Sequence, residues 1–238
     1  MSNLIIDEGN TLCKAFVFEG DAIVAQESAP ELSGSQLINL AKKYYIDKII
    51  SSSTRRTQFP VPEELRHISH IKLDSLTPLP ITIDYLTPET LGHDRIAAAV
   101  GAWRRFPNTD VLIIDVGTAI TIDFIDKNGT FRGGVISPGA EMRARALNHF
   151  TGRLPLVNVP KSSDLQGKTT EEALQYGIVN GIKFEVEGYI NRYKQLCENL
   201  KVIVTGGGAE LMVHQKEQLC FEPNLVAIGL NAILTYLH

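Results

Sequence analysis

The chain has 238 residues, of which 44% are hydrophobic and 21% are charged, and its net charge is −4 at pH 7. This length allows one large domain or two lobes of about a hundred residues each. The negative charge excludes a general basic surface of the kind that binds nucleic acid. No apolar run reaches the roughly 18 residues that a membrane span needs. Because Met-Ser-Asn leads straight into a strand pattern without a signal peptide, we expect a cytoplasmic protein with no membrane partner.

The three cysteines are scattered along the chain without the spacing of a metal site. They are Cys13, Cys197 and Cys220. This pattern favours free thiols in a reducing cytoplasm.

The first part of the chain reads as three strands, a helix and further strands. Strands are predicted over 4–6, 12–18 and 22–26, a helix capped by Ser33 or Ser35 and ending near Tyr45, and strands over 48–52, 71–73 and 81–85. Pro60 and Pro62 predict a short helix before residue 71. This order favours a mixed sheet flanked by helices.

Thr87-Pro88-Glu89 has the composition of a helix start, with a hydroxyl N-cap, a proline at the first helical position and an acid in the first turn. We expect this helix to run to about Arg105. The segment Gly92-His93-Asp94-Arg95 lies near its beginning.

The second half opens with a buried strand from Val111, a turn at Gly117 and an alternating strand to Ile125. A strand over 130–137, a helix after Pro138-Gly139 through 147, a loop over 151–168, a helix over 171–196, a strand over 202–205 and a helix over 225–237 follow. Thr169 or Thr170 would cap the long helix. Its glycines at 177, 181 and 188 cost about 1 kcal/mol each relative to alanine and predict close packing of another element.

A short pattern occurs once in each half of the chain: a strand, Asp-x-Gly, hydroxyl residues and a second strand. It is Asp7-Glu-Gly9-Asn10-Thr11 in the first half and Asp115-Val-Gly117-Thr118 in the second. The repetition predicts a duplicated α/β protein, with an N-terminal lobe over 1–108 and a C-terminal lobe over 109–238, that closes on a phosphate.

Turns of this kind suit phosphate chemistry. Glycine frees backbone N–H groups, and the side chains of Asn10, Thr11, Lys14 and Thr118 add donors, so phosphate oxygens can be held. Carboxylates cannot bind phosphate directly and would instead hold a cation or its waters. A third glycine segment, Gly206-Gly207-Gly208, would let a ligand lie against a helix N-terminus. A P-loop is excluded because Gly-x4-Gly-Lys-[Ser/Thr] does not occur.

Taken together, these segments resemble the acetate/sugar kinase, heat-shock-70 and actin superfamily. Over nearly the whole chain the sequence is similar to the type III pantothenate kinases. The matching segments stand in the same order: 7–14, Tyr85-Leu-Thr-Pro88, Leu91-Gly-His-Asp-Arg95, 115–123, Gly133-Gly-Val-Ile-Ser-Pro-Gly139, Gly167-Lys-Thr-Thr170 and Thr205-Gly-Gly-Gly208. Glu8, His93 and Lys168-Thr169 depart from the usual family residues, and an acid at Glu8 would alter the handling of cations.

The resemblance implies two ribonuclease-H-like lobes, each a mixed sheet flanked by helices, with an ATP cleft between them. It implies ATP-dependent phosphorylation of pantothenate to 4'-phosphopantothenate, the first step of coenzyme A biosynthesis. It also implies ATP with Mg²⁺ or another divalent cation, a monovalent cation (K⁺ or NH₄⁺) and a homodimer.

Residue roles follow from the resemblance as well. Asp94 would be the general base, and Asp115 would ligate the monovalent cation. The pantothenate pocket would comprise Tyr85, Gly92, His93, Asp94, Arg95 and Thr170. ATP phosphates would be held by Asp7, Glu8, Gly9, Asn10, Thr11, Leu12, Cys13, Lys14 and Thr118.

Several alternatives stay open at this point. Asp94-Arg95 is also typical of a solvated charge pair, Tyr85 of a half-buried strand tyrosine, and Thr170 of an N-cap. Asp123 is either a group that supports the site or a plain strand residue. The scaffold also suits a kinase for another hydroxylated acid, because fold does not fix substrate. A regulator that has kept the fold without catalysis is the remaining alternative.

Overall fold

The computed structural model describes the backbone of residues 2–55, 61–215 and 219–238. The described chain forms two compact units. Unit 1 comprises residues 1–107, 129–131 and 224–238, and unit 2 comprises 108–128 and 132–223. The division of the domains at 108/109 stays a prediction. Pro60, which was expected to open a short helix, lies outside the described residues.

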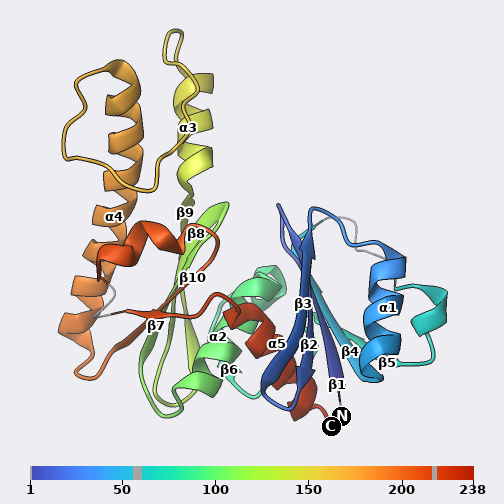
Figure 1. Cartoon of the computed structure of the whole chain (residues 1–238). Coiled ribbons are helices and arrows are strands. Elements are labelled where there is room, and N and C mark those ends of the chain that lie inside the picture. Colours follow the sequence, from blue (N-terminus) through green and yellow to red (C-terminus); the bar gives the residue numbers. More distant parts are fainter. Residues whose placement is uncertain (1, 56–60, 216–218) are drawn as a thin grey trace. The chain divides into compact units, whose positions relative to one another are not determined.

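Unit 1 is built on a mixed sheet with the strand order β3-β2-β1-β4-β5 (Figure 1). The strands are β1 (Ser2–Glu8), β2 (Cys13–Glu19), β3 (Ala22–Ala29), β4 (Ile46–Ser53) and β5 (Ser69–Lys72). β1 pairs antiparallel with β2 and parallel with β4, and β4 pairs parallel with β5. The predicted strands of this region are therefore confirmed, with ends shifted by a few residues.

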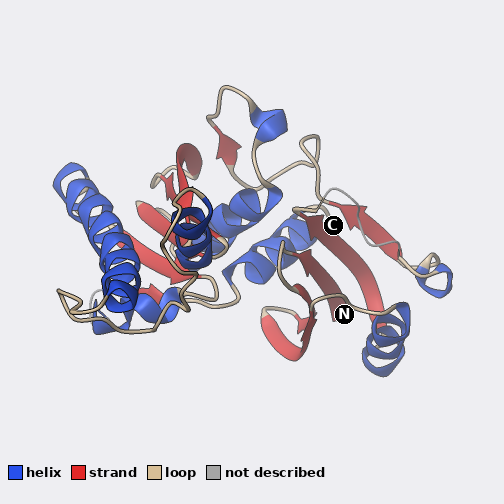
Figure 2. Cartoon of the chain, turned by 90° about the horizontal axis from the view of Figure 1, so that it is seen from above, coloured by secondary structure: helices blue, strands red, loops and turns tan. Residues whose placement is uncertain are grey.

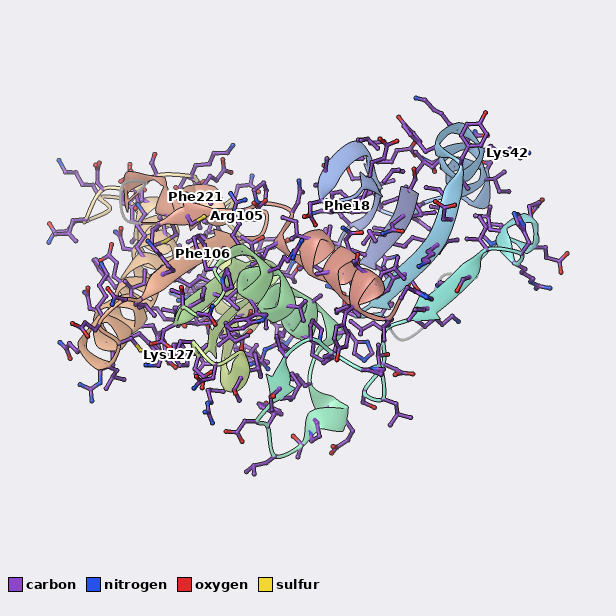
Figure 3. The ribbon with its side chains drawn as sticks, turned by 90° about the horizontal axis from the view of Figure 1, so that it is seen from below. Phe18, Lys42, Arg105, Phe106, Lys127 and Phe221 are labelled. Carbon is purple, nitrogen blue, oxygen red and sulfur yellow. The ribbon has the colours of Figure 1, made fainter. Side chains whose placement is uncertain are left out.

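Helix α1 (Gly34–Tyr44) covers one face of this sheet, with Leu37, Leu40 and Ala41 buried. Ser33 is its N-cap, and Gln36 completes a capping box with it. The core on this side joins α1 to apolar residues of β1, β2 and β4, among them Leu4, Ile6, Ala15, Val17 and Ile49. Lys42 is exposed on the outer side of α1 (Figure 3).

Unit 2 repeats the topology of unit 1. Its strands are β7 (Val111–Val116), β8 (Ala119–Ile125), β9 (Thr130–Pro138), β10 (Lys201–Thr205) and β11 (Cys220–Phe221), in the order β11-β10-β7-β8-β9. β7 pairs antiparallel with β8 and parallel with β10, and β10 pairs parallel with β11. When the five strands named for each unit are numbered along the chain, both sets have the order third-second-first-fourth-fifth. In the second sheet β6 (Thr82–Ile83) adds a sixth strand beside β9. The predicted α/β architecture of mixed sheets flanked by helices is thus confirmed (Figure 2).

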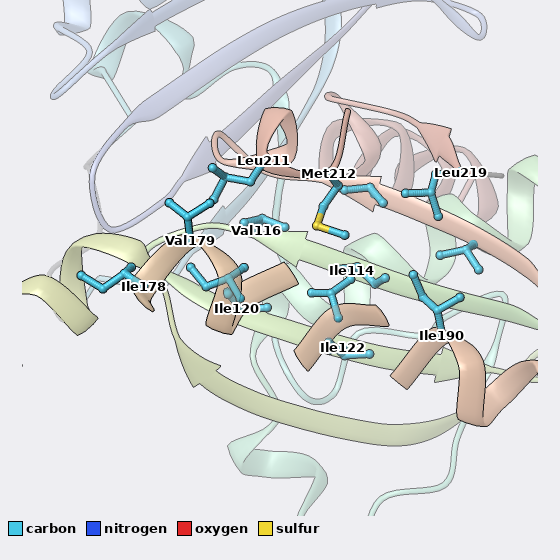
Figure 4. Close-up of a cluster of buried hydrophobic side chains, with 14 of the residues drawn as sticks. Ile114, Val116, Ile120, Ile122, Ile178, Val179, Ile190, Leu211, Met212 and Leu219 are labelled. Carbon is cyan, nitrogen blue, oxygen red and sulfur yellow. The ribbon is translucent and has the colours of Figure 1, made fainter. Parts of the chain in front are cut away.

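The core of unit 2 lies between this sheet and helix α4 (Thr170–Leu196). Ile114, Ile120 and Ile122 of the sheet meet Ile178 and Val179 of the helix in one buried cluster (Figure 4). The 3-10 helix η3 (Ala209–Gln215) adds Leu211 and Met212 to the cluster. Helix α3 (Ala140–His149) adds Ala144.

Helices α2 (His93–Arg105) and α5 (Leu225–Tyr236) pack closely within unit 1. A side chain at Gly101 would collide with the Leu225 carbonyl, and one at Gly229 would collide with the Ala97 carbonyl. Glycine at both positions therefore lets the two backbones touch. Burial of Ile96, Val100 and Leu230 completes this contact.

Two predictions about helices are wrong. The helix expected from Thr87 is broken: Pro88–Thr90 form the 3-10 helix η2, Leu91 is extended, and α2 begins at His93 with Gly92 as N-cap. The glycines of α4 do not mark close packing within the described chain. Nothing lies within 4 Å of a Cβ added at Gly177 or Gly188, and Gly181 meets only the guanidinium of Arg143.

The strand predicted over 81–85 is shorter than expected. It is β6 (Thr82–Ile83), which pairs with Thr130 and Phe131 at the start of β9. Over the described residues, no helix is both long enough and apolar enough to cross a membrane.

Candidate active site

The turn between β1 and β2 is the first predicted phosphate site. Asp7 at the end of β1 is half-buried and pairs in register with Lys14 of β2. The carbonyl of Glu8 accepts hydrogen bonds from the backbone N–H and the hydroxyl of Thr54, at 3.0 and 3.1 Å. The Arg55 guanidinium donates to the Gly9 carbonyl at 2.9 Å. The turn is therefore held through its carbonyls by the residues that follow β4.

This arrangement orients the turn's donors. In a planar trans peptide the N–H points away from the carbonyl of the same unit. With the Glu8 and Gly9 carbonyls turned toward Thr54 and Arg55, the N–H groups of Gly9 and Asn10 point the opposite way. The side chains of Asn10 and Thr11 are exposed beside them. An anion can be held by such a set of donors.

Cys13 was expected to contribute to this turn. It is buried, with 2% of its surface exposed. Burial, followed by the nearby charge of Glu8, raises the pKa of its thiol to about 11. The thiol is therefore neutral near pH 7, and only its backbone is suited to bind a phosphate.

The turn between β7 and β8 is the second predicted phosphate site. Asp115 is half-buried, while Gly117 and Thr118 are exposed. Gly139 donates its N–H to the Thr118 carbonyl at 3.1 Å and packs so closely on the turn that a Cβ there would collide with the carbonyls of Gly117 and Thr118. Gly139 is the last residue of the Gly133–Gly139 segment, and its packing on this turn explains the need for glycine.

The Gly206–Gly208 segment wraps around the end of β7. Gly206 has a positive φ of 88° and lies against the Asp115 carboxylate, where a Cβ would collide with it. Gly208 donates its N–H to the Val116 carbonyl at 2.8 Å. Only open space surrounds a Cβ added at Gly207 among the described residues. The segment leads into a helix, as expected, which is the 3-10 helix η3.

The aspartate of each turn lies beside a hydroxyl residue on an adjacent strand. Asp7 pairs in register with Ser52 of β4, and Asp115 pairs with Thr205 of β10. Each aspartate thus stands beside a buried hydroxyl residue on the adjacent parallel strand. The two halves therefore repeat the surroundings of these aspartates as well as the turns themselves.

The start of α2 carries the predicted base. Asp94 is half-buried in the first turn, where one carboxylate oxygen accepts the backbone N–H of Arg95 at 2.8 Å. A Cβ at Gly92 would lie 2.5 Å from that oxygen. The glycine therefore leaves space for the Asp94 carboxylate. The helix dipole also favours a negative charge at this end.

Arg95 is buried, with 6% of its surface exposed. Its guanidinium carbon lies 5.8 Å from the centre of the Tyr85 ring and 5.7 Å from that of Phe131. The two rings are themselves 6.2 Å apart and tilted by 54°. Tyr85 and Arg95 were both predicted as pocket residues, and the structure brings them together.

Thr170 is exposed in the first turn of α4. Thr169, not Thr170, is the N-cap, with Glu172 completing a capping box. The hydroxyl of Thr170 is thus not used for capping. His93, the first residue of α2, is half-buried beside Asp94.

Among the described residues, no group of three or more His, Cys, Asp or Glu side chains could hold a metal ion. Asp7 and Asp115 each offer a single carboxylate. Mg²⁺ is commonly bound through one or two carboxylates together with substrate phosphates and waters, so either aspartate suits a nucleotide-bound cation.

Known proteins are similar to this chain over nearly its whole length. Residues 3–192 match the family model of the type III pantothenate kinases. The type III pantothenate kinase of Cytophaga hutchinsonii is 42% identical over 98% of this chain and 99% of its own length. That of Bacteroides fragilis is 41% identical over 98% of each chain. The chain belongs to the type III pantothenate kinase family.

The fold of this type III pantothenate kinase family member is also seen in a more distant solved structure. The activator of 2-hydroxyisocaproyl-CoA dehydratase from Clostridium difficile, with bound ADPNP, has a TM-score of 0.57. It is 16% identical and is matched over 99% of this chain and 94% of its own. At that identity the likeness concerns the fold alone.

Sequence reasoning missed two groups that touch the predicted site residues. Phe131 contacts Tyr85 and Arg95, and Thr54 with Arg55 holds the first turn. No local motif marks these residues. Their roles depend on strand pairings between segments far apart in the sequence, β6 with β9 and β1 with β4.

Proposed function

We propose that the chain transfers the γ-phosphoryl group of ATP to the primary hydroxyl of pantothenate, giving 4'-phosphopantothenate and ADP. The reaction opens coenzyme A biosynthesis. Sequence identities of 42% and 41% to two type III pantothenate kinases, over 98% of this chain, support the reaction. The observation that carries it in this chain is Asp94 beside the buried Arg95, which lies against Tyr85.

Asp94 acts as the general base. Its carboxylate accepts the proton of the pantothenate hydroxyl while that oxygen forms a bond to the γ-phosphorus, and the bond to the β-phosphate oxygen breaks. General base catalysis contributes about 10²–10⁴-fold. One Asp94 oxygen accepts the N–H of Arg95, which fixes the carboxylate for this step.

Arg95 binds the pantothenate carboxylate. The planar fork of a guanidinium matches a carboxylate with two parallel hydrogen bonds. Tyr85, Gly92, His93 and Thr170 complete the pocket in this proposal. The half-buried position of Tyr85 and the exposed hydroxyl of Thr170 are compatible with contacts to a polar ligand.

In this proposal the residues of the two predicted phosphate turns bind ATP. The turn over Asp7–Lys14 donates N–H and side-chain groups to the phosphates, and Thr118 adds a hydroxyl from unit 2. Asp115 ligates a monovalent cation, K⁺ or NH₄⁺, with its carboxylate beside Gly206. Mg²⁺ or another divalent cation, when bound to the phosphates, neutralises the charge that develops during transfer.

We also propose that two copies of the chain form a homodimer through the outer side of α3 and α4. A groove of about 580 Å³ between these helices is lined mainly by apolar residues, among them Leu147, Phe150, Leu174 and Ile178. Phe150 is 83% exposed in the single chain.

A cytoplasmic location fits the described cysteines, all of which are free thiols.

The experiment is a measurement of ADP release by the purified chain with ATP, Mg²⁺ and K⁺, with pantothenate present or omitted. We expect release that depends on pantothenate, and a product heavier by one phosphoryl group. Replacing K⁺ with Na⁺ tests the monovalent cation in the same assay. Background release from a folded protein, with no phosphorylated pantothenate, would contradict the proposal. Turnover of another hydroxylated acid would then indicate a different kinase, and nucleotide binding without turnover would indicate a regulator.

A further inference from the structure

Phe131 is a buried aromatic residue outside the short segments that carry the resemblance to the family. Its side chain has 0% of its surface exposed. The Arg95 guanidinium lies over its ring at 5.7 Å, and the Tyr85 ring is 6.2 Å away. Arg95 is therefore placed against two aromatic rings, of which only Tyr85 was predicted from the sequence.

These rings can stabilise a buried cation. Removing a guanidinium from water is costly unless other groups compensate the charge. The negative face of an aromatic ring attracts a cation without accepting any of its N–H donors. Since all N–H groups of arginine lie in the plane of the guanidinium, contacts to the ring faces do not use these donors.

The backbone holds Phe131 in this position. The Phe131 carbonyl accepts the N–H of Asp84 at 3.0 Å, and the Gly129 carbonyl accepts that of Thr82 at 2.9 Å. Gly129 has a positive φ of 76° and packs against the Trp103 ring. Residues 129–131 thus belong to unit 1, although the sequence around them belongs to unit 2.

We propose that Phe131 is a positioning residue for substrate binding. Its ring holds the Arg95 guanidinium against Tyr85 so that the donor edge of Arg95 meets the carboxylate of the substrate. This inference rests on the proposed function, in which Arg95 binds the pantothenate carboxylate. Phe131 itself does not touch the substrate.

The test replaces Phe131 by leucine and, in a second series, by 4-fluoro-, 3,5-difluoro- and 3,4,5-trifluorophenylalanine. Leucine keeps an apolar side chain and removes the ring face. Fluorine keeps the ring and its shape while withdrawing electron density from the face. We expect Phe131→Leu to raise the KM for pantothenate about 3- to 30-fold with kcat within about 2-fold, and the fluorinated series to raise KM stepwise. The KM for ATP should stay unchanged.

Phe18→Leu is the matched control, because Phe18 of β2 is equally buried in unit 1. It should lower the unfolding temperature as much as Phe131→Leu does without changing the KM for pantothenate. A double-mutant cycle with Arg95→Gln tests the route through the guanidinium. In that background Phe131→Leu should change KM less than about 2-fold, since the cation is already gone.

The outcomes separate this inference from the proposed function. If the wild-type chain does not phosphorylate pantothenate, the proposed function fails before any variant is made. If the wild type is active and the fluorinated series leaves KM unchanged, Phe131 has no positioning role. Equal KM effects of Phe131→Leu with and without Arg95 would likewise contradict the proposal.

Discussion

Two nearby residues, Gly92 and Arg95, hold the Asp94 carboxylate in place. Gly92 leaves the space that its carboxylate occupies, and the N–H of Arg95 binds one of its oxygens. We expect Asp94→Asn to lower kcat by at least about 10²-fold, because an amide cannot accept the proton of the substrate hydroxyl. The amide oxygen can still accept the Arg95 N–H, so the unfolding temperature should hardly change. Steady-state kinetics and thermal unfolding check both expectations.

Asp21→Asn is a suitable control for this variant. Asp21 is an exposed aspartate of unit 1 whose carboxylate pairs with Arg104 at 2.8 Å, and exposed pairs contribute little to stability. It should leave kcat unchanged. Near-normal turnover of Asp94→Asn would remove Asp94 from the mechanism.

At the scale of elements, the β1–β2 turn depends on the segment after β4. Arg55 donates to the carbonyls of Gly9 and Pro30, at 2.9 and 2.8 Å, and so ties the turn to the end of β3. We expect Arg55→Gln to raise the KM for ATP about 5- to 50-fold, because a turn that loses one to two charge-assisted hydrogen bonds no longer holds its N–H donors in place. The KM for pantothenate should change much less.

Arg66→Gln is the matched control for Arg55→Gln. Arg66 pairs with Glu63 at 2.9 Å on an exposed 3-10 helix, η1 (Glu63–Leu65) and its C-cap, in the same unit. If both variants change the KM for ATP equally, the effect is one of net charge and not of the turn. If neither variant changes the KM for ATP, the hydrogen bonds from Arg55 to the turn do not contribute to nucleotide binding.

Local patterns predicted most elements, and the errors fall where the local pattern was misleading or absent. Ser33 and the apolar run of β2 are strong local signals, and both elements formed as expected. Thr87-Pro88-Glu89 is an equally good helix start, yet the helix breaks at Leu91, whose backbone is extended and whose side chain is buried. Strand β11 is too short to show a period, so its pairing with β10 had no signal in the sequence.

At the scale of the whole molecule, the repeated strand order explains why the repeated motif was informative. Asp7 and Asp115 follow corresponding first strands in sheets of the same order, beside Ser52 and Thr205. The sequence alone predicted the aspartates and the glycines of the turns. It did not predict Phe131, because residues 129–131 join unit 1 through pairing with β6, forty-odd residues earlier in the chain, and through packing on Trp103 of α2.

The exposed apolar side of α3 and α4 concerns the assembly of two copies of the chain. Phe150 is 83% exposed, and Gly177 lines the groove with open space around it, although glycine weakens a helix by about 1 kcal/mol relative to alanine. Both features are costly in an isolated chain and useful where a second copy packs. Light scattering after size exclusion should therefore give the mass of two chains for the wild type.

Leu147→Glu combined with Phe150→Glu should give the mass of one chain at low micromolar concentration, because two carboxylates would be buried without partners in the interface. Leu76→Glu is the matched control, since Leu76 is 88% exposed in unit 1, and it should leave the mass at two chains. A double variant that keeps the mass of two chains would show that another face forms the dimer. A wild type with the mass of one chain at all concentrations would show that this groove does not bind a second copy.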